Sequence, residues 1–574
     1  MNSPDQIVES STATGAPPIS LSAPSTAATL VVPDNEPSPH ALQVCLRLFF
    51  EHHFACDFSS FDYPHDFERK CARDALLSSS VIALCSRYVS DADAQALFGK
   101  PSAAEVCRCY LQKARTLAKA ASDEASVAHI QGNLILAMAE LLSNSGSRHW
   151  LFAGSAMRMA EIMRLNKEFH QKHTPREREV RRRTYWACLL LDRALAYLLG
   201  KHRTIQLENV TIAVPSSCLS FDESPGVTLS NLATYSRPGD LGFDAYLIAT
   251  VCIWSDLADF AVYSRRRLDR YPPIDPRSIF YSRNSTLNGW IDSLPSSLRW
   301  SVHNYDTRCT MGQKKSFVSM HFLLHSASCV AHQCYLPHLT VYTKLVDLID
   351  AAGLSYLHAD PVLINTCVYQ AMEIGEMLAF LMDPERGNDR SSLRTIWVAL
   401  SILIAANTFL WLQYSQDETY SGPNVHHRAK TYFRLVHQLV ASWIPEWKIA
   451  GQWLAALNVM NDLYKAAYLG EINESILSQD AKMNHSHEDD LTNNDFRPQP
   501  GDGYPTVIAL PNLQASVKFA TSDTSATAIS VESVWLQLSG GWPIGFTGPE
   551  CLILPALEAV QPNLLPADES PQPK

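Results

Sequence analysis

The chain has no two cysteines in C-x-x-C spacing, although it holds 14 cysteines in 574 residues. Cysteine pairs at that spacing are typical of zinc-binding modules, so the sequence predicts no zinc site of that kind. The first residues also lack the basic start and the long apolar run of a secretory signal. We therefore expect a reducing compartment and free thiols, several of which fall inside apolar helical patterns.

Motifs that carry common catalytic chemistry are missing as well. The sequence contains no G-x-S-x-G, no G-x-x-x-x-G-K-[ST] and no H-E-x-x-H. Terpene-synthase-like helical enzymes need paired carboxylates for Mg²⁺, and the run DLID at 347–350 lacks them. A second candidate begins at Asp462 but continues with Lys465 and Leu469, which are the wrong ligands. We expect a protein that is not an enzyme and that binds no cofactor through this chain.

Positive charge is scarce at both ends of the chain. The net charge is −11, but residues 1–39 contain four acids and no Lys or Arg, and residues 476–574 contain twelve acids against four bases. The body between them therefore has a net charge of about +1. Such a balance argues against a protein that coats DNA or an anionic membrane along its whole length.

Regular strand patterns and fixed-period repeats are absent too, and helical patterns follow one another over residues 40–475. Residues 1–39 are rich in Ser, Thr, Ala and Pro, which is typical of a disordered arm. Residues 476–574 indicate a mostly disordered acidic tail. The predicted fold class is all-α, a large multi-helix domain with disordered N- and C-terminal segments. Pro, Gly, Asp and Ser predict loops at 55–66, 216–240, 271–277, 303–313 and 383–391.

One apolar run, IWVALSILIAANTFLWL at 396–412, is as long as a short membrane span. Its seventeen residues are at the lower limit for crossing about 30 Å of hydrocarbon. Ser401, Asn407 and Thr408 interrupt it, and no basic cluster flanks it on one side only. We expect a buried core helix and no membrane partner.

The stretch TPREREVRRRTYWACLLLDR predicts a long helix that begins at a capping box. Thr174 is the expected N-cap, and Gly200 is the expected residue after the last turn. Glu177–Arg181 and Glu179–Arg183 have the favourable i,i+4 order of acid before base. One stripe of the helix is expected to face the core: Thr184, Cys188, Leu191, Leu195 and Leu198.

Two further side chains of this helix need partners. Arg182 precedes Trp186 by one turn and is expected to stack on its ring. Asp192 lies in an apolar run, and Arg193 or an arginine from another helix is its expected partner. These local partners favour a structural role for the arginines over direct contact with DNA phosphates, which is the other reading of a basic run.

The preceding helix, expected over 148–165, has an apolar face that includes Trp150 and Met157. Ala153 and Gly154 are small and leave room for a neighbouring backbone.

Together, these two helices resemble the fungal-specific transcription factor domain, the middle homology region of fungal zinc-cluster regulators. The family pattern reads W-x-x-x-G-x-A-x-R-M-A, then E-x-R-R-R-x-W-W, then D-R, G-R-P and a later Leu-Pro. Departures are Tyr185 for the first Trp of the pair, Arg164 where the family often has Gly, and Lys201-His202 for Arg-Pro. Weaker echoes at 48–67, 287–300 and 320–339 extend the resemblance over most of 40–470. The matching residues are Trp150, Gly154, Ala156, Arg158, Met159, Ala160, Glu179, Arg181, Arg182, Arg183, Trp186, Asp192, Arg193, Gly200 and Val214-Pro215.

The resemblance implies a fungal transcription regulator in the nucleus, specific for a pathway of metabolic or secondary-metabolite genes. Family members usually carry an N-terminal zinc cluster of six cysteines, and this chain holds none, nor any Lys or Arg before Arg47. Promoter DNA would then be reached through a partner or through a zinc cluster missing from this chain. The implied partners are transcription machinery or another regulator, a homo- or heterodimer, and a small-molecule effector.

The alternative is a DNA-free helical binding protein that sequesters regulators or senses a small metabolite.

A second basic cluster, SRRRLDR, precedes Tyr271-Pro272-Pro273. It has three readings, a nuclear import signal, a contact with phosphate or a solvated helix end. The residues of the import-signal reading are Arg265, Arg266, Arg267 and Arg270.

Overall fold

The structure is a computed structural model that describes residues 37–469, apart from 59, 169–172, 217–225, 236–240, 263–268, 270, 337–359, 387, 416–419 and 421–422. Within these residues almost all regular structure is helical, and two isolated bridges, Ala213–Thr228 and Ser216–Leu241, join extended segments. The predicted all-α fold is confirmed. The expected N-terminal arm and acidic tail lie almost wholly outside the described residues.

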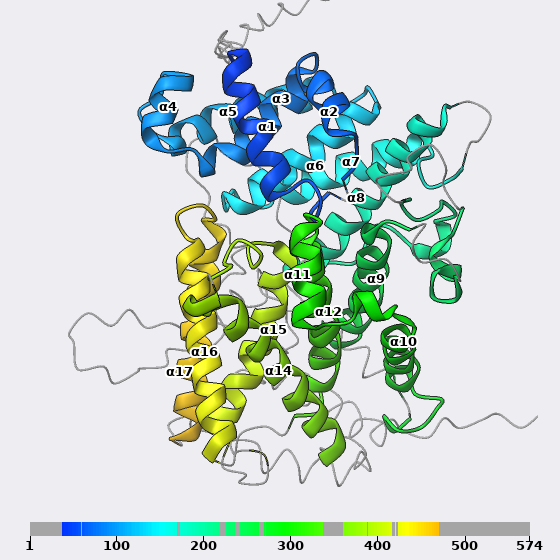
Figure 1. Ribbon diagram of the computed structural model, residues 1–574, viewed down its shortest axis with the longest axis vertical. Helices are drawn as coiled ribbons and strands as arrows, with labels where there is room; N and C mark the ends of the chain where they lie inside the picture. The colour runs from blue at the N-terminus through cyan, green and yellow to red at the C-terminus, as the bar shows by residue number, and fades with distance from the viewer. Residues whose placement is uncertain are drawn as a thin grey trace, which may run out of the picture. The chain divides into compact units, whose positions relative to one another are not determined.

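The helices follow the chain in two groups that meet at a long helix, α8 (Figure 1). The first group packs α3 against α5 and α6, and α6 against α7. In the second group α12 packs against α9, α14 and α15, and α15 also packs against α16 and α17. The helices are α1 (Pro39–His52), α2 (Pro64–Cys71), α3 (Ala75–Cys85), α4 (Asp91–Phe98), α5 (Ala103–Ala120), α6 (Val127–Leu142), α7 (Arg148–Ile162), α8 (Pro175–Leu199), α9 (Phe243–Val262), α10 (Ile279–Ser293), α11 (Val302–Thr310), α12 (Lys314–Gln333), α14 (Pro361–Met382), α15 (Ile396–Tyr414), α16 (Pro423–Trp443) and α17 (Ile449–Tyr468).

Short polar residues set where many of these helices begin. The Ser102 hydroxyl accepts the Glu105 N–H at 3.2 Å, and this bond satisfies one of the free donors in the first turn of α5. At the other end of a helix, Gly200 closes α8 with φ 58°, a conformation that glycine adopts without strain. The same side-chain capping occurs at Ser38, Asp74, Ser90, Ser126, Thr174, Ser278, Ser301, Asp360 and Thr395.

Helix α11 lies where we predicted a loop, at 303–313. The Ser301 hydroxyl caps its first turn by accepting the Asn304 N–H at 3.1 Å. One aromatic side chain, Tyr305, anchors the helix by packing edge-on to Phe380 with ring centroids 5.7 Å apart. The prediction was wrong because a nine-residue helix that buries a single side chain shows no apolar period.

Helix α15 is buried on all sides, as predicted for a core helix. It is the one described helix that is long and apolar enough to cross a membrane, and 94% of its most apolar window is buried inside the protein. Its polar side chains bond to neighbouring helices. The Ser401 hydroxyl lies 3.0 Å from that of Ser326, Thr408 accepts from Gln333 at 2.8 Å, and Asn407 accepts from a tyrosine of α17 at 2.7 Å. Core packing therefore accounts for the long apolar run.

Helices α14 and α16 approach each other closely at Gly375. A Cβ there would lie only 2.7 Å from Cε2 of Tyr432 and even closer to other ring atoms. We expect Gly375→Ala to lower the free energy of unfolding by about 1–3 kcal/mol because the ring must shift. Gly289→Ala on α10 is the control, since its Cβ meets nothing within 4 Å, and we expect a gain of about 0.5–1 kcal/mol. Urea denaturation of both variants tests this, and effects of the same sign would contradict the close approach.

Candidate functional site

The motif-bearing helices α7 and α8 pack against each other, and α8 also packs on α6 and α9. The predicted capping box is present: Thr174 accepts the Glu177 N–H at 3.2 Å, and the Glu177 carboxylate accepts the Thr174 N–H at 2.8 Å. We expected one stripe of α8 to face the core, but all side chains from Glu179 to Leu198 are buried except Arg181. Because neighbours cover nearly every face, the charges of α8 must find partners inside the protein.

Arg183 is fully buried, and each nitrogen of its guanidinium has a partner. Nε donates to Glu179 at 2.8 Å, Nη1 to Asp244 at 2.9 Å, and Nη2 to the Ser216 carbonyl at 2.6 Å. The Glu179 carboxylate also accepts the Ser216 N–H at 3.0 Å. Burial raises the pKa of Asp244, and the charge of Arg183 opposes that rise. The predicted Glu179–Arg183 pair is confirmed, and the network joins α8, α9 and the chain at Ser216.

Arg182 is also buried, and it pairs with two carboxylates. Nη2 donates to Glu168 at 3.0 Å, and Nη1 donates to Glu179 at 3.2 Å. We expected Arg182 to stack on Trp186, but no such contact occurs in the described structure. Trp186 is instead buried, and its indole N–H donates to the Ala213 carbonyl at 2.9 Å. The prediction was wrong because two carboxylates offer stronger, charge-assisted bonds than the face of an indole ring.

Asp192 and Arg193 form a buried pair that holds the loop after α8. The Asp192 carboxylate accepts the N–H groups of Thr204 at 2.9 Å and Ile205 at 3.1 Å. Arg193 donates to Asp192 through Nη1 and to the Ile205 carbonyl through Nη2 at 2.8 Å. The prediction that Arg193 is the partner of Asp192 is confirmed.

Arg181 is the member of the arginine run that remains half-buried at the surface. Its Nη2 donates to the Met163 carbonyl at 2.9 Å, just after the end of α7. The predicted ion pair with Glu177 is not formed within 4.0 Å in this part of the described structure. That prediction was wrong because the Glu177 carboxylate binds the Thr174 cap instead. Burial lowers the pKa of Arg181.

The motif residues of α7 have mixed surroundings. Met159 is buried, Trp150 is half-buried and Arg158 is exposed. We expected another backbone to approach Gly154, but a Cβ there would meet only the Arg158 side chain, at 3.5 Å, among the described residues. This prediction was wrong because Gly154 lies on a partly exposed face of α7, whereas the adjacent Ala153 faces the interior.

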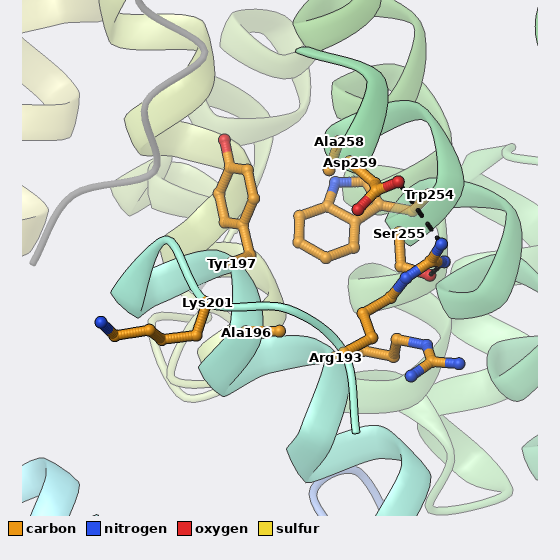
Figure 2. Close-up of a pocket in the computed structure, with 9 residues that line it drawn as sticks. Arg193, Ala196, Tyr197, Lys201, Trp254, Ser255, Ala258 and Asp259 are labelled. Atoms are coloured by element: carbon orange, nitrogen blue, oxygen red, sulfur yellow. Dashed lines mark hydrogen bonds and ion pairs between the residues drawn. The ribbon is translucent and has the colours of Figure 1, made fainter. Parts of the chain in front are cut away.

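A recess of about 250 Å³ lies between α8 and α9, beside the loop that follows Gly200 (Figure 2). The rings of Tyr197 and Trp254 form one wall, with centroids 4.9 Å apart, and Lys201 points away from them. The Tyr197 hydroxyl and the Trp254 indole N–H are buried and have no hydrogen-bond partner among the described residues. The volume of the recess includes open solvent, and the space that can hold the centre of a water molecule is only about 20 Å³, against roughly 10–15 Å³ for one bound water. The recess therefore suits water or a very small molecule better than a typical metabolite.

Comparison with known proteins assigns this helical region to a family. Residues 46–290 match the fungal specific transcription factor domain. The chain carries a fungal specific transcription factor domain. The domain runs from within α1 into α10, and it includes α7, α8 and the Arg183 network. The match ends earlier than the resemblance that we expected over most of 40–470.

The relatives of this fungal specific transcription factor domain are transcription regulators. An uncharacterized transcriptional regulatory protein of Schizosaccharomyces pombe is 26% identical over 243 residues, which are 38% of this chain and 24% of the relative. A second such protein of that yeast is 23% identical over 402 residues, 63% of this chain and 56% of the relative. A Zn(2)-C6 fungal-type transcription factor of Fusarium oxysporum f. sp. lycopersici is 26% identical over 214 residues, 33% of this chain and 23% of the relative. The chain thus spans between about a quarter and just over half of these relatives. No solved structure matches it.

The fungal specific transcription factor domain departs from its family pattern at Arg164, where φ is 51°. This left-handed conformation is easy for glycine and costs other residues about 1–2 kcal/mol. We expect Arg164→Gly to raise the free energy of unfolding by about 1 kcal/mol. Arg158→Gly, an exposed substitution inside right-handed α7, should lower it by about 1 kcal/mol. Urea denaturation distinguishes the two, and a loss of stability in both would show that the backbone at Arg164 is not strained.

Partners that we did not predict complete the arginine network of the domain. Asp244 lies 61 residues after Arg183, and Glu168 lies 14 residues before Arg182. Helical periodicity relates residues three or four positions apart, so it cannot indicate such pairs. The one sign in the sequence that distant carboxylates are needed is that the run has more arginines than nearby glutamates.

The remaining sequence predictions concern import and metal sites. The four arginines predicted as a nuclear import signal, Arg265, Arg266, Arg267 and Arg270, lie outside the described residues. In the described part of the chain, no group of three His, Cys, Asp or Glu side chains is placed to hold a metal ion. The cysteines of that part are free thiols.

Proposed function

We propose that this chain is the regulatory part of a pathway-specific fungal transcription regulator that acts in the nucleus. The match of residues 46–290 and the transcription regulators among the relatives support this class. The proposed targets are a small set of metabolic or secondary-metabolite genes. DNA contact is supplied by a partner or by a zinc cluster missing from this chain, and the chain itself is neither an enzyme nor a cofactor-binding protein.

The burial of Arg182 and Arg183 is the observation that supports DNA contact through a partner or a zinc cluster missing from this chain, and not through α8. A helix that reads DNA presents its basic and polar side chains to a groove. Arg183 is 0% exposed and Arg182 is 6% exposed, and both are bound to carboxylates. Neither can reach a phosphate without unfolding the centre of the domain. Helix α8 therefore has a structural role inside the regulatory domain.

The proposed partners are transcription machinery or another regulator, together with a second copy of the chain or a related subunit. A small-molecule effector is also part of the proposal. The acidic tail after residue 475 is the proposed contact for the transcription machinery, because it mixes acidic and apolar residues, as at Glu532, Trp535, Leu536 and Leu538.

Chromatin occupancy of the tagged, natively expressed protein tests the proposed function. We expect enrichment at a small set of promoters, and we expect it to survive Arg181→Gln if DNA contact is made elsewhere. Absence of enrichment at normal abundance, with a tag that preserves function, would contradict the proposal. That result would favour a DNA-free protein that sequesters regulators or senses a small metabolite.

A further inference from the structure

Apart from α8, a cluster of polar side chains also joins the two groups of helices. From the first group it takes residues 51–57, at the end of α1, and residues 86–88, a short 3-10 helix after α3. From the second group it takes residues 315–319 at the start of α12, residues 394–395 before α15 and residues 446–447 between α16 and α17. We call these segments together the polar junction.

Hydrogen bonds between polar groups cross the polar junction. Arg87 donates through Nη1 to the Glu446 carbonyl at 3.1 Å, and Lys315 donates through Nζ to a carbonyl in the last turn of α1 at 2.8 Å. The Trp447 indole N–H donates to the Tyr88 hydroxyl at 3.2 Å. Bonds to water can replace each of these bonds, so breaking them costs far less free energy than exposing an apolar core.

The polar junction also buries polar atoms that have no hydrogen-bond partner among the described residues. They are His52 Nδ1, Asp57 Oδ1, Arg394 Nε and Glu446 Oε2. A buried polar atom without a partner has given up its bonds to water, which raises the free energy of this closed arrangement. Separation of the two groups of helices at the polar junction lets water reach all of these atoms.

Burial disfavours the charged forms of basic side chains in the polar junction. Burial, together with the nearby charges of Lys315 and Arg394, lowers the pKa of His52 to about 3. Burial also lowers the pKa of Lys315, and the charge of Asp57 opposes that change. Both shifts mean that the protonated forms of these side chains are more stable in water than in the closed junction.

The helices inside each group are held differently from the polar junction. Cys85 of α3 and Cys329 of α12 are 0% exposed, and both helices pack on several neighbours of their own group. Cys56 is also buried, but its thiol lies 3.3 Å from the Ser319 hydroxyl of the other group. Water therefore reaches Cys56 once the groups separate, whereas it reaches Cys85 and Cys329 only when a group unfolds.

We propose that the two groups of helices separate at the polar junction while each group stays folded. The domain then has the closed conformation of this structure and an open conformation in which water binds the polar atoms of the junction. The packing of α8 on α6, α7 and α9 keeps the groups attached, and the contact between α6 and α17 is broken. A ligand or protein that binds one conformation more tightly than the other shifts their populations.

Labelling of the full chain with N-ethylmaleimide, followed by mass spectrometry at each cysteine, tests the proposal. We expect Cys56 to react about tenfold faster than Cys85 and Cys329 in the natural chain, because opening is more frequent than unfolding of a group. Low concentrations of urea should accelerate the labelling of Cys56 less than that of the two reference thiols, Cys85 and Cys329, because opening exposes less surface than unfolding.

Tyr88→Phe tests whether the polar junction controls this labelling. The substitution removes the hydroxyl that Trp447 binds across the junction and that lies 3.0 Å from Nε2 of His53. We expect Cys56 to react about threefold faster or more, with the two reference thiols unchanged. Tyr110→Phe on α5 is the matched control, because the hydroxyl of this buried tyrosine bonds to none of the described residues, and it should leave all three rates unchanged. Urea denaturation confirms that each variant is folded.

Equal labelling rates at Cys56 and at the two reference thiols would overturn the proposal, because unfolding alone would then expose Cys56. Fast labelling of Cys56 that Tyr88→Phe leaves unchanged would overturn it as well, because a local motion of the chain around Cys56 would then be enough. Both measurements use the purified chain without DNA. Failure of this proposal is therefore distinguishable from failure of the proposed function, which promoter occupancy tests.

Discussion

Arg183→Met is expected to lower the free energy of unfolding by about 3–5 kcal/mol, the largest loss that we expect from a single substitution in this domain. The substitution leaves Glu179 and Asp244 inside the protein without the charge that binds both. It also removes the donor to the Ser216 carbonyl. Urea denaturation followed by tryptophan fluorescence measures the change in midpoint.

The control for this prediction is Arg158→Met, the same chemical change at an exposed position of α7. It should alter stability by no more than about 0.5 kcal/mol. A comparable loss in both variants would mean that the loss does not come from breaking the buried network.

The loss caused by Arg183→Met should also depend on pH. Without the arginine, burial raises the folded-state pKa of Asp244 further above its unfolded value. A raised carboxyl pKa favours the folded state at low pH, where the group is protonated, and this advantage is lost as pH rises through the folded pKa. The deficit relative to the natural chain should therefore be smaller near pH 5 than near pH 8. A deficit that is constant over this range would indicate that Asp244 takes up no proton.

Asp192→Asn is the second large effect, an expected loss of about 3 kcal/mol. The carboxylate binds the charged Arg193 and two backbone N–H groups at Thr204 and Ile205, whereas an amide has one acceptor oxygen and two N–H donors. Asp256→Asn is the control, because its pair with Arg203 is 44% exposed on the aspartate side. We expect less than about 1 kcal/mol there.

Trypsin gives a local readout for Asp192→Asn. Lys201 and Arg203 lie in the loop that Asp192 holds through Thr204 and Ile205. Release of these two bonds should speed cleavage after both basic residues, and mass spectrometry of the early fragments identifies the cut sites. Lower stability with an unchanged cleavage rate at this loop would mean that Asp192 stabilises the core without holding the loop.

Several elements were predictable because their signals are local. The capping box at Thr174 and the closing glycine at Gly200 define α8 within one stretch of sequence. The buried pair Asp192–Arg193 was predictable for the same reason, since the partners are adjacent. Helix α11 was not predicted because its only buried aromatic side chain, Tyr305, packs on Phe380 of α14. Phe380 lies 75 residues further along the chain, so the local sequence pattern gives no sign of this contact.

The arginine run at 181–183 shows which features of α8 follow from the sequence and which follow only from the tertiary structure. The sequence by itself determined that 174–199 is a capped helix, that Glu179 and Arg183 face each other one turn apart, and which family the motif resembles. Only the tertiary structure decided that Arg182 and Arg183 are interior while Arg181 remains at the surface. A buried guanidinium needs a carboxylate partner, and the partners Glu168 and Asp244 lie on segments that come close to Arg182 and Arg183 only when the domain is folded. Arg181 has no such partner because the helix cap binds the one acid within reach.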